Sequence, residues 1–142
     1  MITVRHLLQS KQPGLFTIGP DAPVIEAVRA MAEHGVGALL VMRGATLTGI
    51  VSERDYARKV VLLGRASADT PVAHIMSSPV VTVAPQTSVQ RCMMLMTERR
   101  IRHLPVVEGG GVIGVVSIGD LVKAVMEEQQ HTIEQLESYI HG

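Results

Sequence analysis

A serine and an aspartate spaced three residues apart occur twice, each time directly after an apolar segment. The two copies are Gly49-Ile50-Val51-Ser52-x-x-Asp55 and Gly114-Val115-Val116-Ser117-x-x-Asp120. If a helix begins after each serine, its free backbone N–H groups and the serine hydroxyl form a phosphate site. The aspartate beside it can accept two hydrogen bonds from a ribose diol. The motif therefore predicts two nucleotide sites.

The same residues also have a simpler explanation. Serine is a preferred N-cap residue, and an acidic side chain in the first helical turn is favoured by the helix dipole. On this interpretation Ser52 and Ser117 only cap helices. The sequence alone leaves both interpretations open.

A basic cluster, Arg99-Arg100-Ile101-Arg102-His103, precedes the apolar segment 104–107. Arg102 and His103, at the start of that segment, could hold a phosphate through charge-assisted hydrogen bonds. Alternatively, the cluster is a solvated helix end, where cations suit the C-terminal dipole. The first copy has the uncharged pair Gly37 and Ala38 here, which permits close approach of a ligand, and it has Arg54 where the second has Gly119. The two sites are therefore expected to be unequal.

Two threonines are further candidates, since each lies toward the end of the first expected strand of its repeat. The backbone groups of Thr17 and Thr82 could contact an adenine edge between apolar walls such as Ile50 and Val115. Alternatively, both are ordinary β-branched strand residues.

Other motifs predict no chemistry. Gly109-x-Gly111-x-x-Gly114 has the spacing of a dinucleotide fingerprint, but it joins two expected strands and is interpreted as a hairpin turn. No nucleophile elbow surrounds either serine, and the six histidines show no metal-ligand spacing. Cys92 lies in an apolar run and is interpreted as a core thiol, with a redox sensor as the alternative. No catalytic residue and no metal site are predicted.

The two copies are parts of a longer internal repeat. Thr17-Ile18-Gly19-Pro20 resembles Thr82-Val83-Ala84-Pro85 at an offset of 65 residues, and the serine and aspartate pairs keep that offset. Val4, His6 and Leu7 match residues 72, 74 and 75 at an offset of 68. We therefore predict repeats over 1–64 and 72–128, a linker over 65–71 and a helical tail over 129–142.

Each repeat has the pattern of a β-α-β-β-α unit. Apolar residues predict strands at 15–18, 38–42 and 49–51, and at 80–83, 104–107 and 114–116. Helical spacing follows the first strand of each set, with Thr87 and Ser88 suited to cap the second repeat's helix. One unit of about 60 residues is marginal alone, so the two are expected to pack with pseudo-two-fold symmetry. The expected fold class is therefore α/β (α+β). In the helical tail, Ile133, Leu136 and Ile140 are expected to lie on one face of the helix.

Composition excludes several classes of protein. The chain has 142 residues, 46% of them hydrophobic and 18% charged, with a formal net charge of zero. A nucleic-acid binder needs a basic excess, and 2% aromatic residues are too few for base stacking. No apolar run approaches the length of a membrane span, and residues 1–10 lack the pattern of a signal peptide. With one cysteine, the expected location is the cytoplasm.

With these features together, the sequence resembles a pair of CBS domains (named for cystathionine β-synthase), or Bateman module, as in small stand-alone bacterial proteins. The resemblance covers about residues 4–128. It is particularly close in five segments: Gly37-Ala38-Leu39-Leu40-Val41-Met42, Ser52-Glu53-Arg54-Asp55-Tyr56-Ala57-Arg58-Lys59-Val60, His74-Ile75-Met76, Arg102-His103-Leu104-Pro105-Val106-Val107 and Ser117-Ile118-Gly119-Asp120.

The resemblance implies two clefts between the repeats that bind adenosine-containing ligands such as AMP, ADP, ATP, NAD(H) or S-adenosylmethionine. It implies that the two aspartates take ribose hydroxyls, that the two serines take phosphate, and that Arg102 and His103 form a phosphate clamp. It places Thr17 and Thr82 on the adenine side. The full set of expected nucleotide-binding residues is Thr17, Gly37, Ala38, Ile50, Ser52, Arg54, Asp55, Thr82, Arg102, His103, Pro105, Val115, Ser117, Gly119 and Asp120.

The expected function is that of a non-catalytic sensor. It would bind adenine nucleotide in two unequal clefts, form a homodimer and signal to another protein, without binding nucleic acid or membrane. The alternative is an association module that dimerises without ligand.

Overall fold

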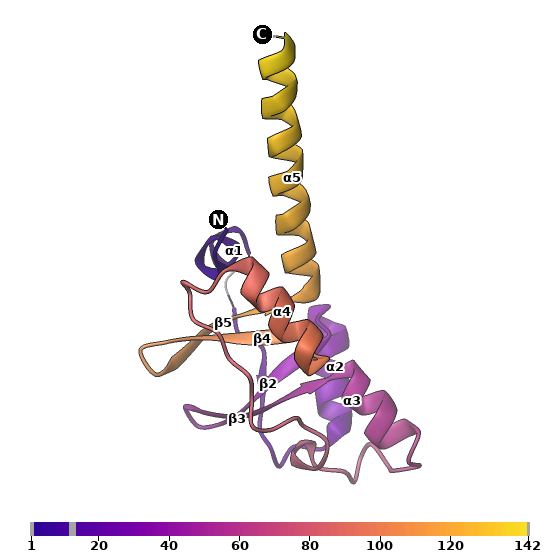
Figure 1. The fold of residues 1–142 in the computed structure, drawn as a ribbon. Helices are drawn as coiled ribbons and strands as arrows, with labels where there is room; N and C mark the ends of the chain where they lie inside the picture. Colours follow the sequence, from indigo (N-terminus) through magenta and orange to yellow (C-terminus); the bar gives the residue numbers. More distant parts are fainter. Residues whose placement is uncertain (1, 12–13, 142) are drawn as a thin grey trace. The chain divides into compact units, whose positions relative to one another are not determined.

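The computed structural model describes residues 2–11 and 14–141, and its contacts group into two compact units (Figure 1). Unit 2 spans 14–81, and unit 1 combines 1–13 with 82–142. Each unit contains one small β-sheet with helices, which confirms the mixed α+β class with two repeats.

Unit 2 contains a three-stranded sheet of order β1-β2-β3, in which β1 pairs parallel to β2 and β2 pairs antiparallel to β3. A π-helical turn, η1, follows the short helix α3, and a 3-10 turn, η2, precedes the end of the unit. Its elements are β1 (Thr17–Ile18), α2 (Val24–His34), β2 (Ala38–Arg43), β3 (Thr46–Ser52), α3 (Glu53–Tyr56), η1 (Ala57–Val61) and η2 (Val72–His74).

Unit 1 contains a two-stranded antiparallel sheet, β4-β5, and three helices. The predicted strand at 80–83 is reduced to one parallel bridge between Val83 and Val106, because residues 80–82 have no ladder partner in the described chain. The elements are α1 (Val4–Ser10), α4 (Val89–Arg99), β4 (His103–Glu108), β5 (Gly111–Ser117) and α5 (Ile118–His141).

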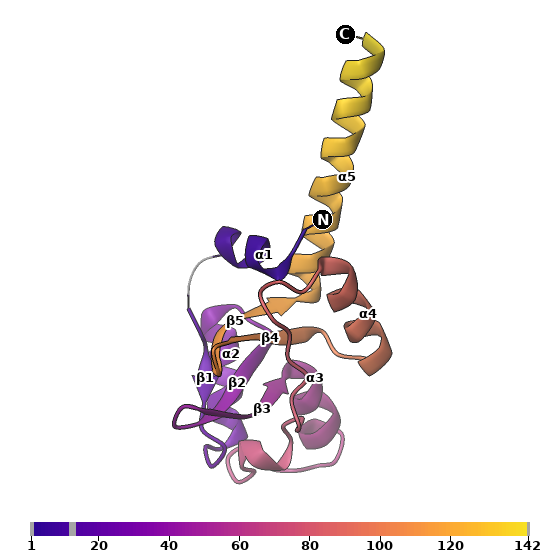
Figure 2. The same ribbon diagram turned by 60° about the vertical axis from the view of Figure 1, so that its left-hand side comes forward.

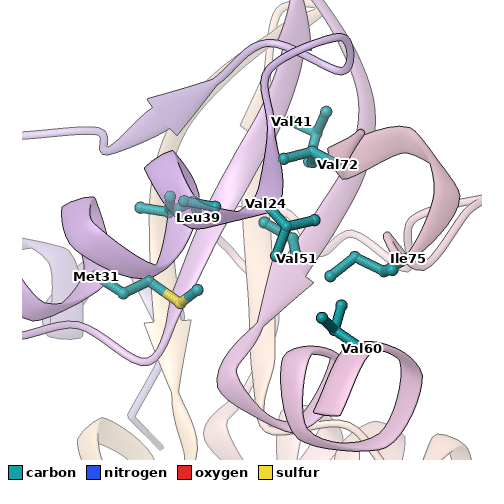
Figure 3. Close-up of a cluster of buried hydrophobic side chains, with 9 residues drawn as sticks. Val24, Met31, Leu39, Val41, Val51, Val60, Val72 and Ile75 are labelled. Carbon is teal, nitrogen blue, oxygen red and sulfur yellow. The ribbon is translucent and has the colours of Figure 1, made fainter. Parts of the chain in front are cut away.

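The core of unit 2 lies between α2 and the sheet. Figure 3 shows side chains from α2, β2, β3, η1 and η2 pointing toward one another. The cluster consists of Val24, Ala27, Met31, Leu39, Val41, Val51, Val60, Val72 and Ile75, each at most 3% exposed. The continuous apolar run of β2 is therefore explained by burial.

The compact units differ from the predicted repeat boundaries, because the first segment of each repeat joins the other repeat's sheet. Ser77 exchanges backbone hydrogen bonds of 2.9 and 3.1 Å with Ile50 on β3, and helix α1 packs on β5. Glycines make room for these segments: a Cβ on Gly49 would lie 2.5 Å from Met76 Sδ, and one on Gly114 would lie 2.6 Å from Leu8 Cδ2.

Residues of the predicted linker, 65–71, pack against the start of α2. The carbonyl oxygens of Ser67 and Thr70 accept hydrogen bonds from Ile25 and Val24 at 3.0 and 2.8 Å. They satisfy N–H groups at the start of α2, whose N-cap residue Pro23 has no side-chain cap.

Three further predictions can be compared with the structure. Ser88 caps α4 by accepting a hydrogen bond from the Arg91 N–H at 3.1 Å, as predicted. The glycine-rich segment after β4 is the expected hairpin turn, with positive φ at Gly109 and Gly110. The tail is helical, as predicted, and it is continuous with the helix that begins after Ser117: α5 runs unbroken from Ile118 to His141, with no glycine or proline after residue 119.

Candidate functional site

In unit 2, Ser52 ends β3 and caps α3. Its hydroxyl accepts a hydrogen bond from the Asp55 N–H at 3.2 Å, while its own N–H and hydroxyl donate to Asp55 Oδ2 at 2.9 and 3.0 Å. This reciprocal capping box fixes one carboxylate oxygen of Asp55 against the backbone. We call Ser52 and Asp55 the unit 2 corner.

In unit 1, Ser117 and Asp120 have the same arrangement at the start of α5. The Ser117 N–H donates to Asp120 Oδ2 at 2.8 Å, and the Ser117 hydroxyl accepts from the Asp120 N–H at 3.2 Å. We call this pair the unit 1 corner. The capping interpretation is thus observed at both corners, and nucleotide binding there stays a prediction.

Each corner aspartate also contacts a lysine that sequence reasoning missed. In unit 2, Lys59 Nζ lies 3.3 Å from Asp55 Oδ1 and donates to the Ile75 carbonyl at 2.9 Å. In unit 1, Lys11 Nζ donates to Asp120 Oδ2 and to the Val115 carbonyl, both at 2.8 Å. The spacing of four between Asp55 and Lys59 could have identified the first pair. Nothing local could have identified the second, since Lys11 is 109 residues from Asp120.

The surroundings of Asp120 act on its pKa in opposite directions. Burial would raise it, but the hydrogen bonds from Lys11 and from the Ser117 backbone, together with the Lys11 charge, outweigh burial and lower the pKa. Asp120 is therefore an ionised hydrogen-bond acceptor near neutral pH.

The predicted clamp residues lie beside the unit 1 corner. His103 on β4 is directly opposite Ser117 on β5, and the Arg102 carbonyl accepts the Ile118 N–H at 2.9 Å. Burial, followed by the charge of Lys11, lowers the pKa of His103 despite the opposing effect of Asp120. His103 is therefore mainly neutral at pH 7 and would act on a phosphate as a hydrogen-bond donor rather than as a cation.

The corresponding positions of unit 2 have the same backbone geometry without charge. Ala38 is opposite Ser52, and the Gly37 carbonyl accepts the Glu53 N–H at 3.0 Å. The first N–H of the helix at each corner is therefore already bonded, which reduces the number of free donors that the sequence predicted. Arg54 and Gly119 lie in the first turn after each serine, as expected.

The predicted adenine-side residues form a row across each sheet. In unit 2, Thr17 pairs with Leu40, which pairs with Ile50. In unit 1, Pro105 pairs with Val115 and accepts a hydrogen bond from the N–H of Val83, the neighbour of Thr82. Within each unit the backbone thus connects the predicted adenine side to the strand that leads into the corner.

The remaining candidate groups have no role at the corners. Cys92 is buried in α4, and burial raises the pKa of its thiol, as expected for an unreactive core cysteine. Among residues 2–11 and 14–141, no three His, Cys, Asp or Glu side chains gather closely enough to hold a metal ion. No helix in the described part of the chain is both long and apolar enough to cross a membrane.

Known proteins with similar sequences and folds have the same two repeats. A family model described as the CBS domain matches residues 4–62 and 72–127. The Arabidopsis thaliana "CBS domain-containing protein CBSX3, mitochondrial" is 46% identical over 127 residues. The match covers 86% of this chain but 62% of that relative, so the chain spans less than two thirds of it.

Two solved structures extend the comparison. A protein with CBS domains from Burkholderia ambifaria is 50% identical and matches with a TM-score of 0.87, covering 90% of this chain and 96% of that one. The CBS domain protein PAE2072 from Pyrobaculum aerophilum, solved in complex with AMP, is 29% identical with a TM-score of 0.74, covering 84% and 89%. The chain belongs to the CBS-domain family and contains two CBS repeats.

Proposed function

We propose that this chain is a non-catalytic sensor in which the two corners hold the ribose and phosphate of an adenine nucleotide, AMP or NAD(H). The observation that supports it most is the repetition of one serine–aspartate geometry at two corners of a CBS chain. The AMP complex of the solved relative supports the ligand class.

The lysines suggest how a ribose would enter. Asp55 and Asp120 each keep a backbone hydrogen bond from their serine, which leaves the lysine contact as the exchangeable one. A ribose diol donates two hydrogen bonds to a carboxylate and would replace that contact. The released ammonium group could then pair with the nucleotide's phosphate.

The two corners differ in the hydrogen-bond donors available for phosphate. The unit 1 corner has Lys11 in contact, with Arg102 and His103 adjacent in the fold. The unit 2 corner has Lys59 in contact and Arg54 in the first turn of α3, but Ala38 replaces the histidine. We therefore expect tighter phosphate binding in unit 1, while unit 2 takes a ligand less dependent on the clamp, such as a longer dinucleotide.

Isothermal titration calorimetry with AMP, ADP, ATP, NAD, NADH and S-adenosylmethionine tests the proposal. Asp120→Asn keeps the shape of the side chain and should weaken binding at unit 1 about ten-fold or more, since a hydrogen bond to a charged acceptor contributes about 1.5–3 kcal/mol. Asp55→Asn should act likewise at unit 2. The exposed Asp69 supplies the matched control, Asp69→Asn, which should change nothing.

Circular dichroism and thermal unfolding must show that each variant is folded. A wild-type chain that binds none of the six ligands would contradict the proposal. So would a folded Asp55→Asn, Asp120→Asn double variant that binds as tightly as wild type.

A second candidate function is self-association without ligand, and one observation favours it. The outer half of α5 exposes Ile133, Leu136, Tyr139 and Ile140. Silent calorimetry together with a ligand-independent dimer mass would select this function over nucleotide sensing.

A further inference from the structure

The outer half of α5 is an exposed helix with apolar side chains. Every residue from 126 to 141 is exposed, and Figures 1 and 2 both show α5 extending beyond the rest of unit 1. Met126 is 63% exposed, Leu136 58% and Ile140 74%. Burial of such side chains is favourable by about 25 cal/mol per Å² of apolar surface, so this surface favours a partner.

The spacing of these residues indicates what kind of partner covers them. One line of residues along α5, which begins at Val122 and ends at Ile140, has successive positions that are alternately four and three residues apart. This is the heptad spacing by which one helix packs against another. We define the α5 seam as Val122, Met126, Gln129, Ile133, Leu136 and Ile140.

We propose that the α5 seam pairs with the α5 seam of a second copy of this chain, and that the two helices run antiparallel. In this register Met126 lies across from Leu136 of the second copy. Ile133 likewise meets Gln129, and Ile140 meets Val122. Five of the six seam positions are apolar, and Gln129 supplies the polar one.

Charge complementarity favours the antiparallel direction. Lys123 and Glu137 flank the seam on the same side, and the antiparallel register places Lys123 opposite Glu137 of the second copy, twice per pair. A parallel pair would instead place Glu137 beside Thr132 and Lys123 beside Ile118, so that neither charge would meet an opposite one. It would also align the two helix dipoles, which the antiparallel pair opposes.

A groove beside the α5 seam also favours the antiparallel direction. It has a volume of about 450 Å³ between α4 and α5 and is lined by Gln90, Val125, Glu128, Gln129, Thr132 and Ile133. The antiparallel register brings Tyr139 of the second copy opposite Val125, on the groove's side of the seam. Tyr139 is 88% exposed in the single chain, and its hydroxyl would find a hydrogen-bond partner in the Gln90 carboxamide.

Cross-linking of mixed variants tests both the contact and its direction. Lys123→Cys and Glu137→Cys are made in the full chain, where Cys92 is buried and stays in place. A short bismaleimide should link the two variants to each other in an equal mixture and should link neither variant to itself. In a parallel pair positions 123 and 137 would be separated by about 21 Å along the helix axis, so the mixed product would not form.

Three results would overturn the proposal: absence of the mixed product, linking of either variant to itself, or a monomer mass for the wild type in light scattering. A wild-type dimer without the mixed product would mean that another surface forms the dimer. Ile133→Gln should lower the dimer fraction, whereas His131→Gln, on the opposite side of α5, should not.

Charge reversal sharpens the test of direction. Lys123→Glu and Glu137→Lys should each raise the dimer dissociation constant about five-fold, as expected for the loss of two exposed ion pairs. The double variant should restore the wild-type value. Failure of the double variant to recover, with all variants equally helical by circular dichroism, would contradict the antiparallel pairing.

Discussion

Unit 1 and unit 2 form the same serine–aspartate box, but their lysines come from different places. In unit 2, Lys59 follows Asp55 by four residues and contacts it whenever the local helix forms. In unit 1, Lys11 lies at the end of α1, and the residue of unit 1 that corresponds to Lys59 in the repeat is Ala124. The local motif thus determines the box, whereas the distant chain determines which cation it meets.

Because of this difference, displacement of the lysine by a ligand would affect the rest of the fold differently at the two corners. Displacement of Lys59 from Asp55 leaves that lysine on the same helical segment. Displacement of Lys11 from Asp120 removes a contact that connects α1 to the start of α5. We therefore expect a ligand at the unit 1 corner to loosen α1, and a ligand at the unit 2 corner to have no comparable effect.

The largest expected difference between the units is at their close-approach glycines. In Gly49→Ala the new Cβ would meet Met76 Sδ at 2.5 Å and the Ser77 carbonyl oxygen at 3.1 Å, and the backbone at Ser77 cannot move without disturbing its pairing with Ile50. In Gly114→Ala only side-chain atoms of Leu8 are close. We expect Gly49→Ala to lower the free energy of unfolding by about 1–3 kcal/mol, and Gly114→Ala by less.

Urea unfolding of both variants measures this difference. Gly19→Ala is the control, because a Cβ there meets no atom within 4 Å and the residue has no positive φ. Equal losses for Gly49→Ala and Gly114→Ala would show that backbone crowding at Ser77 has no role.

A smaller difference is expected at the ends of α2 and α4. Both helices end on a left-handed residue, Gly35 with φ 65° in unit 2 and Arg100 with φ 55° in unit 1. Only glycine adopts this conformation without a Cβ penalty. Arg100→Gly should therefore raise the free energy of unfolding by about 1 kcal/mol, as measured by chemical unfolding.

Arg100→Ala distinguishes the effect of the left-handed backbone conformation from the effect of the arginine charge, because it keeps the Cβ and removes the guanidinium group. It should leave the free energy of unfolding near the wild-type value. Equal stabilisation by alanine and glycine would mean that the arginine's charge, and not its φ angle, is unfavourable at this position.

The sequence predicted what short-range patterns determine. The strands β2 to β5, the helices α2 and α4 and the Ser88 cap follow from apolar spacing and turn residues, and the predicted bounds of the four strands agree with the structure within a few residues. The start of each box after an apolar strand was predicted for the same reason. The internal offset of 65 residues predicted the two-repeat organisation, and the resemblance added the family, which the CBS-domain match confirms.

What the sequence could not predict depends on contacts between distant segments. Helix α1 is short and marginal alone, and its place on β5 depends on space beside Gly114. The contact of Lys11 with Asp120 depends in turn on where α1 lies. No spacing rule relates residues 109 positions apart, so the sequence could predict neither the composition of the compact units nor the contact of Lys11 with Asp120.

The smallest expected effect concerns that lysine and its dependence on pH. The pKa of Asp120 is lowered in the fold, so the folded state binds this proton less readily than the unfolded chain. The resulting stabilisation is present above the ordinary aspartate pKa of about 3.9 and is lost as pH falls through the lowered folded value. Lys11 is 37% exposed, so Lys11→Met should lower the free energy of unfolding at pH 7 by about 0.5 kcal/mol.

The penalty of Lys11→Met should shrink in two steps as pH falls. Lys11 also lowers the pKa of His103, and a lowered histidine pKa destabilises the fold below about pH 6.5, so removing Lys11 gives back stability there first. The second step lies below the ordinary aspartate pKa. His103→Gln should abolish the first step alone, and Arg43→Met, at an exposed pair with Asp21, should show neither. A penalty that is constant from pH 7 to pH 3 would mean that Lys11 stabilises α1 through packing of its aliphatic chain and not through the charge of Asp120.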